Sequence, residues 1–177
     1  MALKLIDHKV IYSGVVFNTI VDEVEYESGN RSVREVAEHP GGAVVLPVLD
    51  DGRIVFVHQY RYPLKEYLYE LPAGKLEPNE PPEECARREL KEETGYDAGR
   101  LEKLTAIYTT PGFCTEKLHI FVARDLRDGK QQLEEGELGL SLKYVPASEA
   151  FEMVRRNEIV DAKTIVGLFF LEKLLNR

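Results

Sequence analysis

The segment at residues 74–96, GKLEPNEPPEECARRELKEETGY, constrains the fold of this chain more than any other part of it. Proline is tolerated in the first turn of a helix, so Pro81 and Pro82 fit a helix start, and the glutamates after them suit the positive end of the helix dipole. Gly95 is typical of the left-handed residue that ends a helix. The segment therefore predicts a loop that leads into one helix.

Three glutamates, Glu89, Glu92 and Glu93, share one face of this helix, because residues three and four apart are neighbours on a helix surface. Their negative charges repel one another unless a positive group lies between them. Hard divalent cations such as Mg²⁺ prefer carboxylate and carbonyl oxygens and often bridge a protein to substrate phosphates. A solvated charged face is the alternative, and for an ERELKEE stretch alone it is the commoner explanation. Arg88 is predicted to pair with Glu92 and to act as a structural clamp.

The full spacing decides between these explanations. The segment fits the pattern G-x5-E-x7-R-E-U-x-E-E-x-G-U, in which U is a bulky apolar or aromatic residue. Most fixed positions demand one residue type, with about one chance in ten to twenty at each, so a chance match is negligible. The pattern resembles the Nudix box, the signature of hydrolases that cleave nucleoside diphosphates linked to another moiety. Tyr96 is a variant at a position where aliphatic residues are commoner.

The charge balance excludes some classes of protein. A net charge of −8 and a pI near 5.1 argue against a nucleic-acid-binding surface, which usually carries a basic patch. No apolar run approaches the roughly 20 residues of a membrane span, and the start lacks the apolar core of a signal peptide. Cys85 and Cys114 make no disulfide framework. We expect reduced thiols and a cytoplasmic protein.

The remaining chain predicts strands and helices in alternation, hence an α/β fold. Residues 1–40 alternate in short bursts around a turn at Ser28-Gly29-Asn30, which is typical of a small antiparallel β-sheet. Two apolar runs within residues 43–62 flank Asp51-Gly52, a hairpin signal. Three further strands are expected near 105–112, 117–126 and 141–146, and two helices near 148–158 and 161–175.

The likeness extends beyond the box, from about Ser32 to Leu175, and is to the ADP-ribose pyrophosphatase branch of the family. Pro111 is the residue that distinguishes that branch. Five further segments resemble the branch: VREVAEHPGGAVV, HQYRYP, ELPAGK, TTPGFCTE and DAKTI. The resemblance implies a Nudix-type α/β/α sandwich with a mixed sheet at 41–177. It also implies that the sheet at 1–40 is exchanged across a homodimer, which fits a sheet too small to bury its own surface.

The implied reaction is Mg²⁺-dependent hydrolysis of the pyrophosphate bond of ADP-ribose to AMP and ribose 5-phosphate, with Mn²⁺ or another divalent cation as alternatives. Such catalysis depends on positioning and charge neutralisation. Glu89 and Glu93 are the first candidates for metal ligands, completed by Glu92 and the Ala73 carbonyl. Carboxylates bound to metal are poor proton acceptors, so the base must lie elsewhere.

The only acidic run in a suitable place is Glu134-Glu135-Gly136-Glu137. Glu135 and Glu137 resemble the family's pair, one accepting the proton and one reaching the metal, and the sequence leaves their division of roles open. Taken alone, an acidic turn with glycine is usually solvated. Substrate contacts are implied for the positions that match the family's phosphate-, ribose- and adenine-binding residues: Phe17, Arg34, Glu35, Arg61, Pro111, Gly112 and Glu116.

Two other functions remain open. The same reaction on another nucleotide sugar or dinucleotide, such as GDP-mannose or a flavin dinucleotide, would need the same carboxylates. A non-catalytic module that senses ADP-ribose would not need all three glutamates of the box, and their presence favours an enzyme.

Overall fold

The computed structural model describes residues 3–133 and 135–175, and its contacts divide the chain into two compact units. The first, called the N-terminal unit, holds the described residues up to Gly41 together with Tyr108–Lys117. The second, called the C-terminal unit, holds Gly42–Ile107 and the chain from Leu118 onward.

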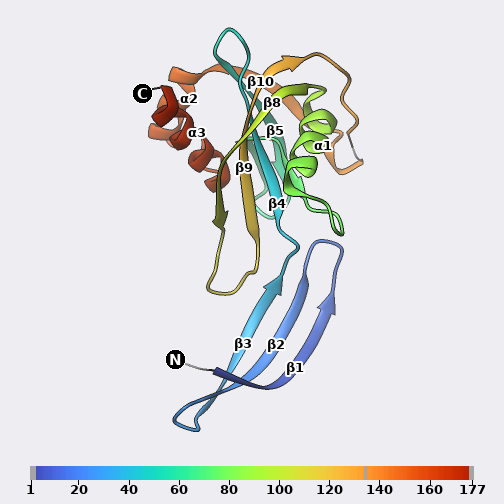
Figure 1. The fold of residues 1–177 in the computed structure, drawn as a ribbon, viewed down its shortest axis with the longest axis vertical. Coiled ribbons are helices and arrows are strands. Elements are labelled where there is room, and N and C mark those ends of the chain that lie inside the picture. Colours follow the sequence, from blue (N-terminus) through green and yellow to red (C-terminus); the bar gives the residue numbers. More distant parts are fainter. Residues whose placement is uncertain (1–2, 134, 176–177) are drawn as a thin grey trace. The chain divides into compact units, whose positions relative to one another are not determined.

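The N-terminal unit is an antiparallel sheet in the order β1-β2-β3, with β1 at Leu3–Ser13, β2 at Asn18–Tyr26 and β3 at Arg31–Glu38 (Figure 1). The predicted strands and their turn are confirmed, and Gly29 supplies the positive φ of 83° that the turn needs. The segment at 108–117 belongs here because it bonds to β3. The Ala37 N–H donates to Phe113 O at 2.7 Å, and the Thr115 N–H donates to Ala37 O at 3.0 Å.

The C-terminal unit contains two sheets. A four-stranded sheet has the order β7-β4-β9-β8, in which β4 runs parallel to β9 and antiparallel to β7, so the predicted mixed sheet is confirmed. A three-stranded antiparallel sheet has the order β10-β5-β6. The strands are β4 Gly42–Pro47, β5 Arg53–Arg61, β6 Glu66–Glu70, β7 Ala73–Lys75, β8 Asp97–Tyr108, β9 Lys117–Arg127 and β10 Ser141–Pro146.

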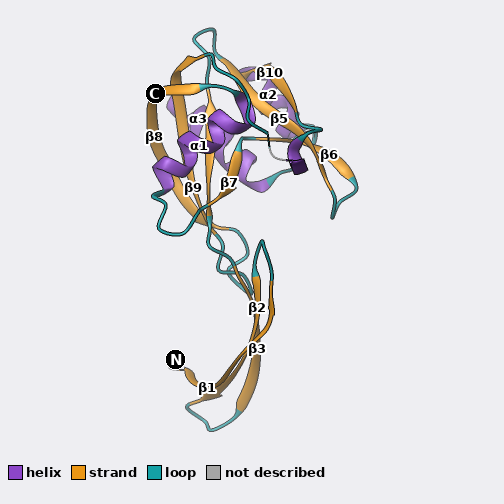
Figure 2. Ribbon diagram, turned by 90° about the vertical axis from the view of Figure 1, so that its right-hand side faces the viewer, coloured by secondary structure: helices purple, strands orange, loops and turns teal. Residues whose placement is uncertain are grey.

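Helices cover both faces of the four-stranded sheet, with α1 (Pro82–Thr94) on one side and α2 (Ala147–Arg155) and α3 (Ala162–Leu175) on the other (Figures 1 and 2). The side chains of strand β4 pack against both layers of helices. Val44 and Leu46 enter the core beneath α2 and α3, whereas Ala43 and Val45 enter the core beneath α1. Successive residues of a strand point to opposite faces of the sheet, so the fully buried strand β4 contributes side chains to two hydrophobic cores. This is the predicted α/β/α sandwich.

The predicted hairpin at Asp51-Gly52 forms, but it is short. The Gly52 N–H donates to Leu49 O and the Leu49 N–H donates to Arg53 O, both at 2.9 Å, and Val48, just after β4, forms an antiparallel bridge with Ile54 of β5. Beyond this bridge, β4 and β5 belong to different sheets. The turn signal is local, whereas strand pairing depends on partners far along the chain. Strand β4 pairs with β9, and β5 pairs with β10, so each run is buried without the other.

Among residues 3–133 and 135–175, no helix combines the length and apolar character needed to cross a membrane.

Candidate active site

The loop and helix predicted for the box are confirmed at both ends. Helix α1 begins after Pro81, whose φ of −64° and ψ of 139° are extended, and Gly95 ends it with a φ of 80° and an N–H bond to Lys91 O. Ala86 and Leu90 are fully buried in the core beneath the helix. This packing turns the glutamate face of α1 toward β7 and the loop that follows it.

Glu89 and Glu93 lie in the protein interior, with 7% and 2% of their surfaces exposed. Burial, followed by the charges of Glu89 and Glu137, raises the pKa of Glu93 well above its ordinary value. Burial also raises the pKa of Glu89, although the adjacent Arg88 opposes this shift. The N–H of Ala73 donates to Oε2 of Glu93 at 3.0 Å. Two buried carboxylates with raised pKa values mark a place that favours added positive charge.

Arg88 joins the helix to the loop that precedes it. Its guanidinium contacts Glu80 at 2.8 and 3.0 Å, Glu89 at 2.6 Å, Glu92 at 3.0 Å and the carbonyl of Lys75 at 3.2 Å. The predicted pair with Glu92 is therefore present. The hydrogen bond from Arg88 lowers the pKa of Glu80 to about 2. This single side chain holds both ends of the box together.

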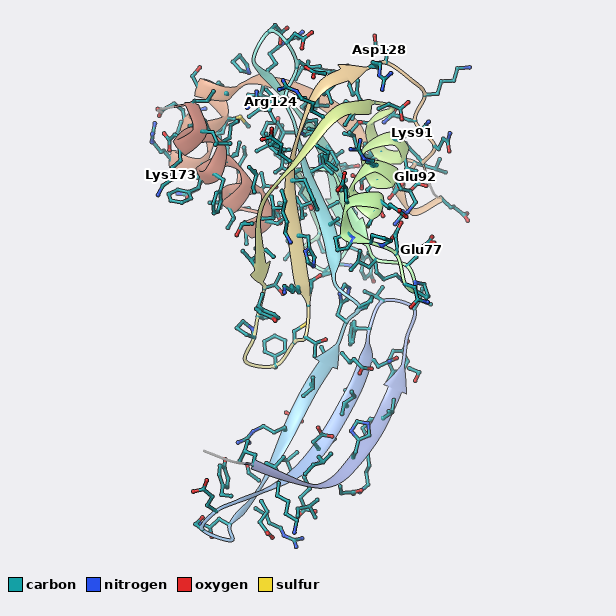
Figure 3. The ribbon with its side chains drawn as sticks, viewed as in Figure 1. Glu77, Lys91, Glu92, Arg124, Asp128 and Lys173 are labelled. Atoms are coloured by element: carbon teal, nitrogen blue, oxygen red, sulfur yellow. The ribbon has the colours of Figure 1, made fainter. Side chains whose placement is uncertain are left out.

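A cavity of about 440 Å³ opens beside these carboxylates. Figure 3 shows two of its lining residues, Glu77 on the loop before α1 and Glu92 on the helix. Gly74 forms part of its wall, and a Cβ atom built there would lie 1.8 Å from Oε1 of Glu89. The backbone at Gly74 thus packs directly against a carboxylate. The lining is Ala73, Gly74, Lys75, Leu76, Glu77, Pro78, Arg88, Glu89, Glu92 and Glu137.

The glutamate side chains around the cavity fit a hard divalent cation, because such ions prefer carboxylate oxygens as ligands. A cation between them would also relieve the repulsion of their negative charges. Within the part of the chain that the structure describes, however, no three His, Cys, Asp or Glu side chains are already arranged as a complete ligand set. Glu89 and Glu92 are both paired with Arg88. A cation that bound here would compete with that guanidinium.

The two candidate bases lie in different surroundings. Both belong to a short 3-10 turn at Glu135–Glu137, but Glu135 is exposed whereas Glu137 lines the cavity. The charge of Glu137 raises the pKa of both Glu89 and Glu93, which places it beside the buried carboxylates. Glu134 of the same acidic run lies outside the described residues.

Most of the predicted substrate contacts lie in the N-terminal unit: Phe17, Arg34, Glu35, Pro111, Gly112 and Glu116. Phe17 is 43% exposed. Arg34 donates to the hydroxyls of Tyr26 at 2.5 Å and Ser32 at 2.9 Å. Glu116 lies 3.6 Å from Nδ1 of His39.

Arg61 is the one predicted substrate contact in the C-terminal unit, and its side chain is bound to the buried Glu70. Glu70 in turn binds Lys163, which binds Asp161. Glu70, Lys163 and Asp161 were not among the predicted site residues. They lie in the segments ELPAGK and DAKTI, whose resemblance to the family was the sequence feature that could have indicated them.

Comparison with known proteins gives consistent results. The family model of the NUDIX domain matches residues 38–166. The chain is 43% identical to the ADP-ribose pyrophosphatase of Bacillus subtilis, over 96% of this chain and 92% of the relative. It is 39% identical to the methanol dehydrogenase activator of Bacillus methanolicus, over 96% and 92%. It is 36% identical to the GDP-mannose pyrophosphatase of Salmonella arizonae, over 80% and 78%.

A solved structure, described as an ADP compounds hydrolase, has the same fold. Its TM-score is 0.87 at 22% identity, with 99% of this chain and 95% of that chain covered.

Proposed function

The chain belongs to the NUDIX domain family, and from this membership we propose that it hydrolyses the pyrophosphate bond of ADP-ribose, giving AMP and ribose 5-phosphate. The observation that carries the proposal is the set of carboxylates around one cavity, Glu89, Glu92, Glu93 and Glu137. They occur in a chain that is 43% identical, over nearly its whole length, to an ADP-ribose pyrophosphatase.

Members of this family generally use divalent cations, and we propose Mg²⁺ here, with Mn²⁺ as a substitute. Glu89, Glu92, Glu93 and the carbonyl of Ala73 would hold the ion, which would neutralise charge on the diphosphate and make water a better nucleophile. Glu137, which lines the cavity, would accept the proton of the attacking water. Arg61 offers its guanidinium to a phosphate, for which the planar donor geometry of arginine is suited.

The N-terminal unit is proposed to supply the remaining substrate contacts. Phe17 would stack on adenine, Arg34 and Glu35 would contact phosphate and ribose, and Glu116 would bind the terminal ribose beside Pro111 and Gly112. The resemblance of these positions to the family supports the assignment. The protein is further proposed to act in the cytoplasm, without a nucleic-acid or membrane partner.

A second substrate deserves the same test, because the chain is 36% identical to a GDP-mannose pyrophosphatase. A phosphate-release assay that includes a coupling phosphatase should be run over ADP-ribose, GDP-mannose and a flavin dinucleotide with Mg²⁺. We expect ADP-ribose to give the highest kcat/KM and excess chelator to abolish turnover. Turnover confined to another nucleotide sugar would overturn the substrate, and undiminished turnover in chelator would overturn the metal dependence. Binding of ADP-ribose without turnover would instead identify a sensor.

We also propose that the protein consists of a hydrolase domain at 41–177 and an N-terminal sheet at residues 1–40 that is exchanged across a homodimer. The sheet leaves several large apolar side chains uncovered, including Leu5 at 56%, Val10 at 52% and Tyr12 at 60% exposure. Apolar surface of this extent on a three-stranded sheet is typical of an interface.

Leu5→Glu should therefore shift the protein from dimer to monomer in sedimentation and lower its activity, because a charge would have to be buried in the interface. Leu175→Glu is the matched control, since Leu175 at the end of α3 is also 56% exposed. The control should leave the sedimentation coefficient unchanged. A wild-type protein that sediments as a monomer at all concentrations and is fully active would contradict the dimer.

A further inference from the structure

Arg61, the last residue of β5, and Glu70, the last residue of β6, form a two-point ion pair. Nε of Arg61 lies 2.6 Å from Oε1 of Glu70, and Nη2 lies 2.6 Å from Oε2. Glu70 is only 1% exposed, whereas the side chain of Arg61 is 40% exposed. The pairing occupies one edge of the guanidinium and leaves Nη1 with no partner among the described residues. Arginine held in this way presents its other edge in a fixed direction.

The carboxylate of Glu70 is itself fixed from behind. Lys163 contacts its Oε2, and Lys163 also contacts Oδ1 of Asp161 at 3.0 Å. Although burial acts to raise the pKa of Glu70, the hydrogen bond from Arg61 and the charge of Lys163 outweigh it, so that the pKa is lowered. Glu70 is therefore an ionised carboxylate between two cations.

The start of helix α3 anchors this chain of ion pairs. Asp161 Oδ2 accepts the N–H of Thr164 at 3.0 Å and its hydroxyl at 2.6 Å. The same hydroxyl oxygen accepts the N–H of Leu71, the residue after Glu70, at 2.8 Å. Thr164 is fully buried. Two routes, one of charges and one of hydrogen bonds, thus tie the end of β6 to α3, so Glu70 has little freedom to move.

Arg61 also lies within electrostatic reach of the carboxylate cluster. Its charge partly opposes the rise in the pKa of Glu93, and the charge of Glu93 adds to the hydrogen bond from Glu70 in raising the pKa of Arg61. A guanidinium free to move would be attracted to Glu93, because Glu93 is buried and surrounded by negative charge. Such a pair would occupy a carboxylate that the cation needs and would withdraw Arg61 from the substrate.

We propose that Glu70, held by Lys163, is a positioning residue that keeps the guanidinium of Arg61 away from Glu93 and directs its Nη1 edge to a phosphate of the substrate. The inference rests on the proposed function for the identity of the phosphate. The part that concerns Glu93 stands on the chain's own charges. Glu70 does not touch the substrate, and its effect passes through Arg61.

The test is a double-mutant cycle of Glu70→Gln and Arg61→Ala. Glu70→Gln alone should lower kcat/KM for ADP-ribose roughly 10- to 100-fold, the range for losing an outer-shell partner. It should also weaken the binding of Mn²⁺, measured by calorimetry without substrate, by roughly 10-fold, because the released arginine competes for Glu93. In the Arg61→Ala background, Glu70→Gln should change neither quantity further.

Losses that persist in the Arg61→Ala background would overturn the proposal, because they would show that Glu70 acts on the fold rather than on Arg61. A silent Glu70→Gln would overturn it as well. If that variant does not fold, Lys163→Met takes its place, with a smaller loss that must again vanish without Arg61. Glu158→Gln is the control, since it breaks an exposed ion pair with Arg156 at 2.7 Å that shares no residue with the network. The Mn²⁺ measurement decides the matter even if ADP-ribose proves not to be the substrate.

Discussion

We expect Glu93→Gln to lower kcat by a factor of about 1,000, the upper end of what the loss of one stabilising group in a closed site costs. Glu93 is the most deeply buried carboxylate of the box, and its pKa is raised by burial and by Glu89 and Glu137. Glutamine keeps the shape and can still accept the N–H of Ala73, but it brings no charge to a cation. Steady-state kinetics at saturating Mg²⁺ measure the effect.

The same substitution should leave the fold intact or make it more stable at neutral pH. A carboxyl group whose pKa is higher in the folded than in the unfolded state binds more protons when folded. The contribution of Glu93 to the free energy of unfolding of the metal-free protein therefore falls as pH rises above about 4.5, the unfolded value, and Glu93→Gln removes this contribution. Thermal unfolding in chelator across this range tests the sign.

Glu84→Gln is the control for both measurements, because Glu84 lies on the same helix but is exposed. It should be nearly neutral in activity and in the slope of stability with pH. Near wild-type turnover of Glu93→Gln at saturating Mg²⁺ would show that Glu93 is not a metal ligand.

Glu137→Gln should lower kcat by roughly 100- to 10,000-fold, the usual contribution of a general base, and leave KM nearly unchanged. A base acts in the transition state rather than in ground-state binding, so the loss belongs in kcat. Glu135→Gln provides a matched comparison, since it makes the same change on the same turn at an exposed position. We expect it to cost much less.

A larger effect at Glu135 than at Glu137 would reverse this assignment. If both substitutions are mild, the proton acceptor lies elsewhere in the chain, and Glu116 becomes the candidate to test. A loss that appears in KM alone would mean that the turn binds substrate without taking part in proton transfer.

The sequence predicts most of what is encoded locally. Helix α1 starts and ends where its prolines and Gly95 indicate, because helix ends depend on residues within one turn. The alternation of residues 1–40 likewise predicts the three strands of the N-terminal unit. Pairing between strands was predicted less well. Asp51-Gly52 forms its turn, yet β4 and β5 separate into different sheets because their partners, β9 and β10, lie far along the chain.

The same distinction holds for the site. Spacing on one helix was enough to group Glu89, Glu92 and Glu93, and Arg88 with Glu92. The ion pairs around Arg61 were missed, because Glu70 is nine positions from Arg61 and 93 from Lys163, so that these side chains meet only in the folded chain. The contact between Lys163 and Glu70 cannot be predicted from the residues near either one in the sequence.

Gly74 bears on how this protein tolerates change. Its backbone occupies the place where a side chain would overlap the carboxylate of Glu89, so a single added methyl group meets an oxygen at 1.8 Å. Alanine at this position would have to displace the carboxylate from the cavity wall. Natural variation and protein engineering therefore meet the same restriction at Gly74. Adding one methyl group there would move the carboxylate of Glu89 in the candidate active site, although a change of this size would leave the rest of the fold in place.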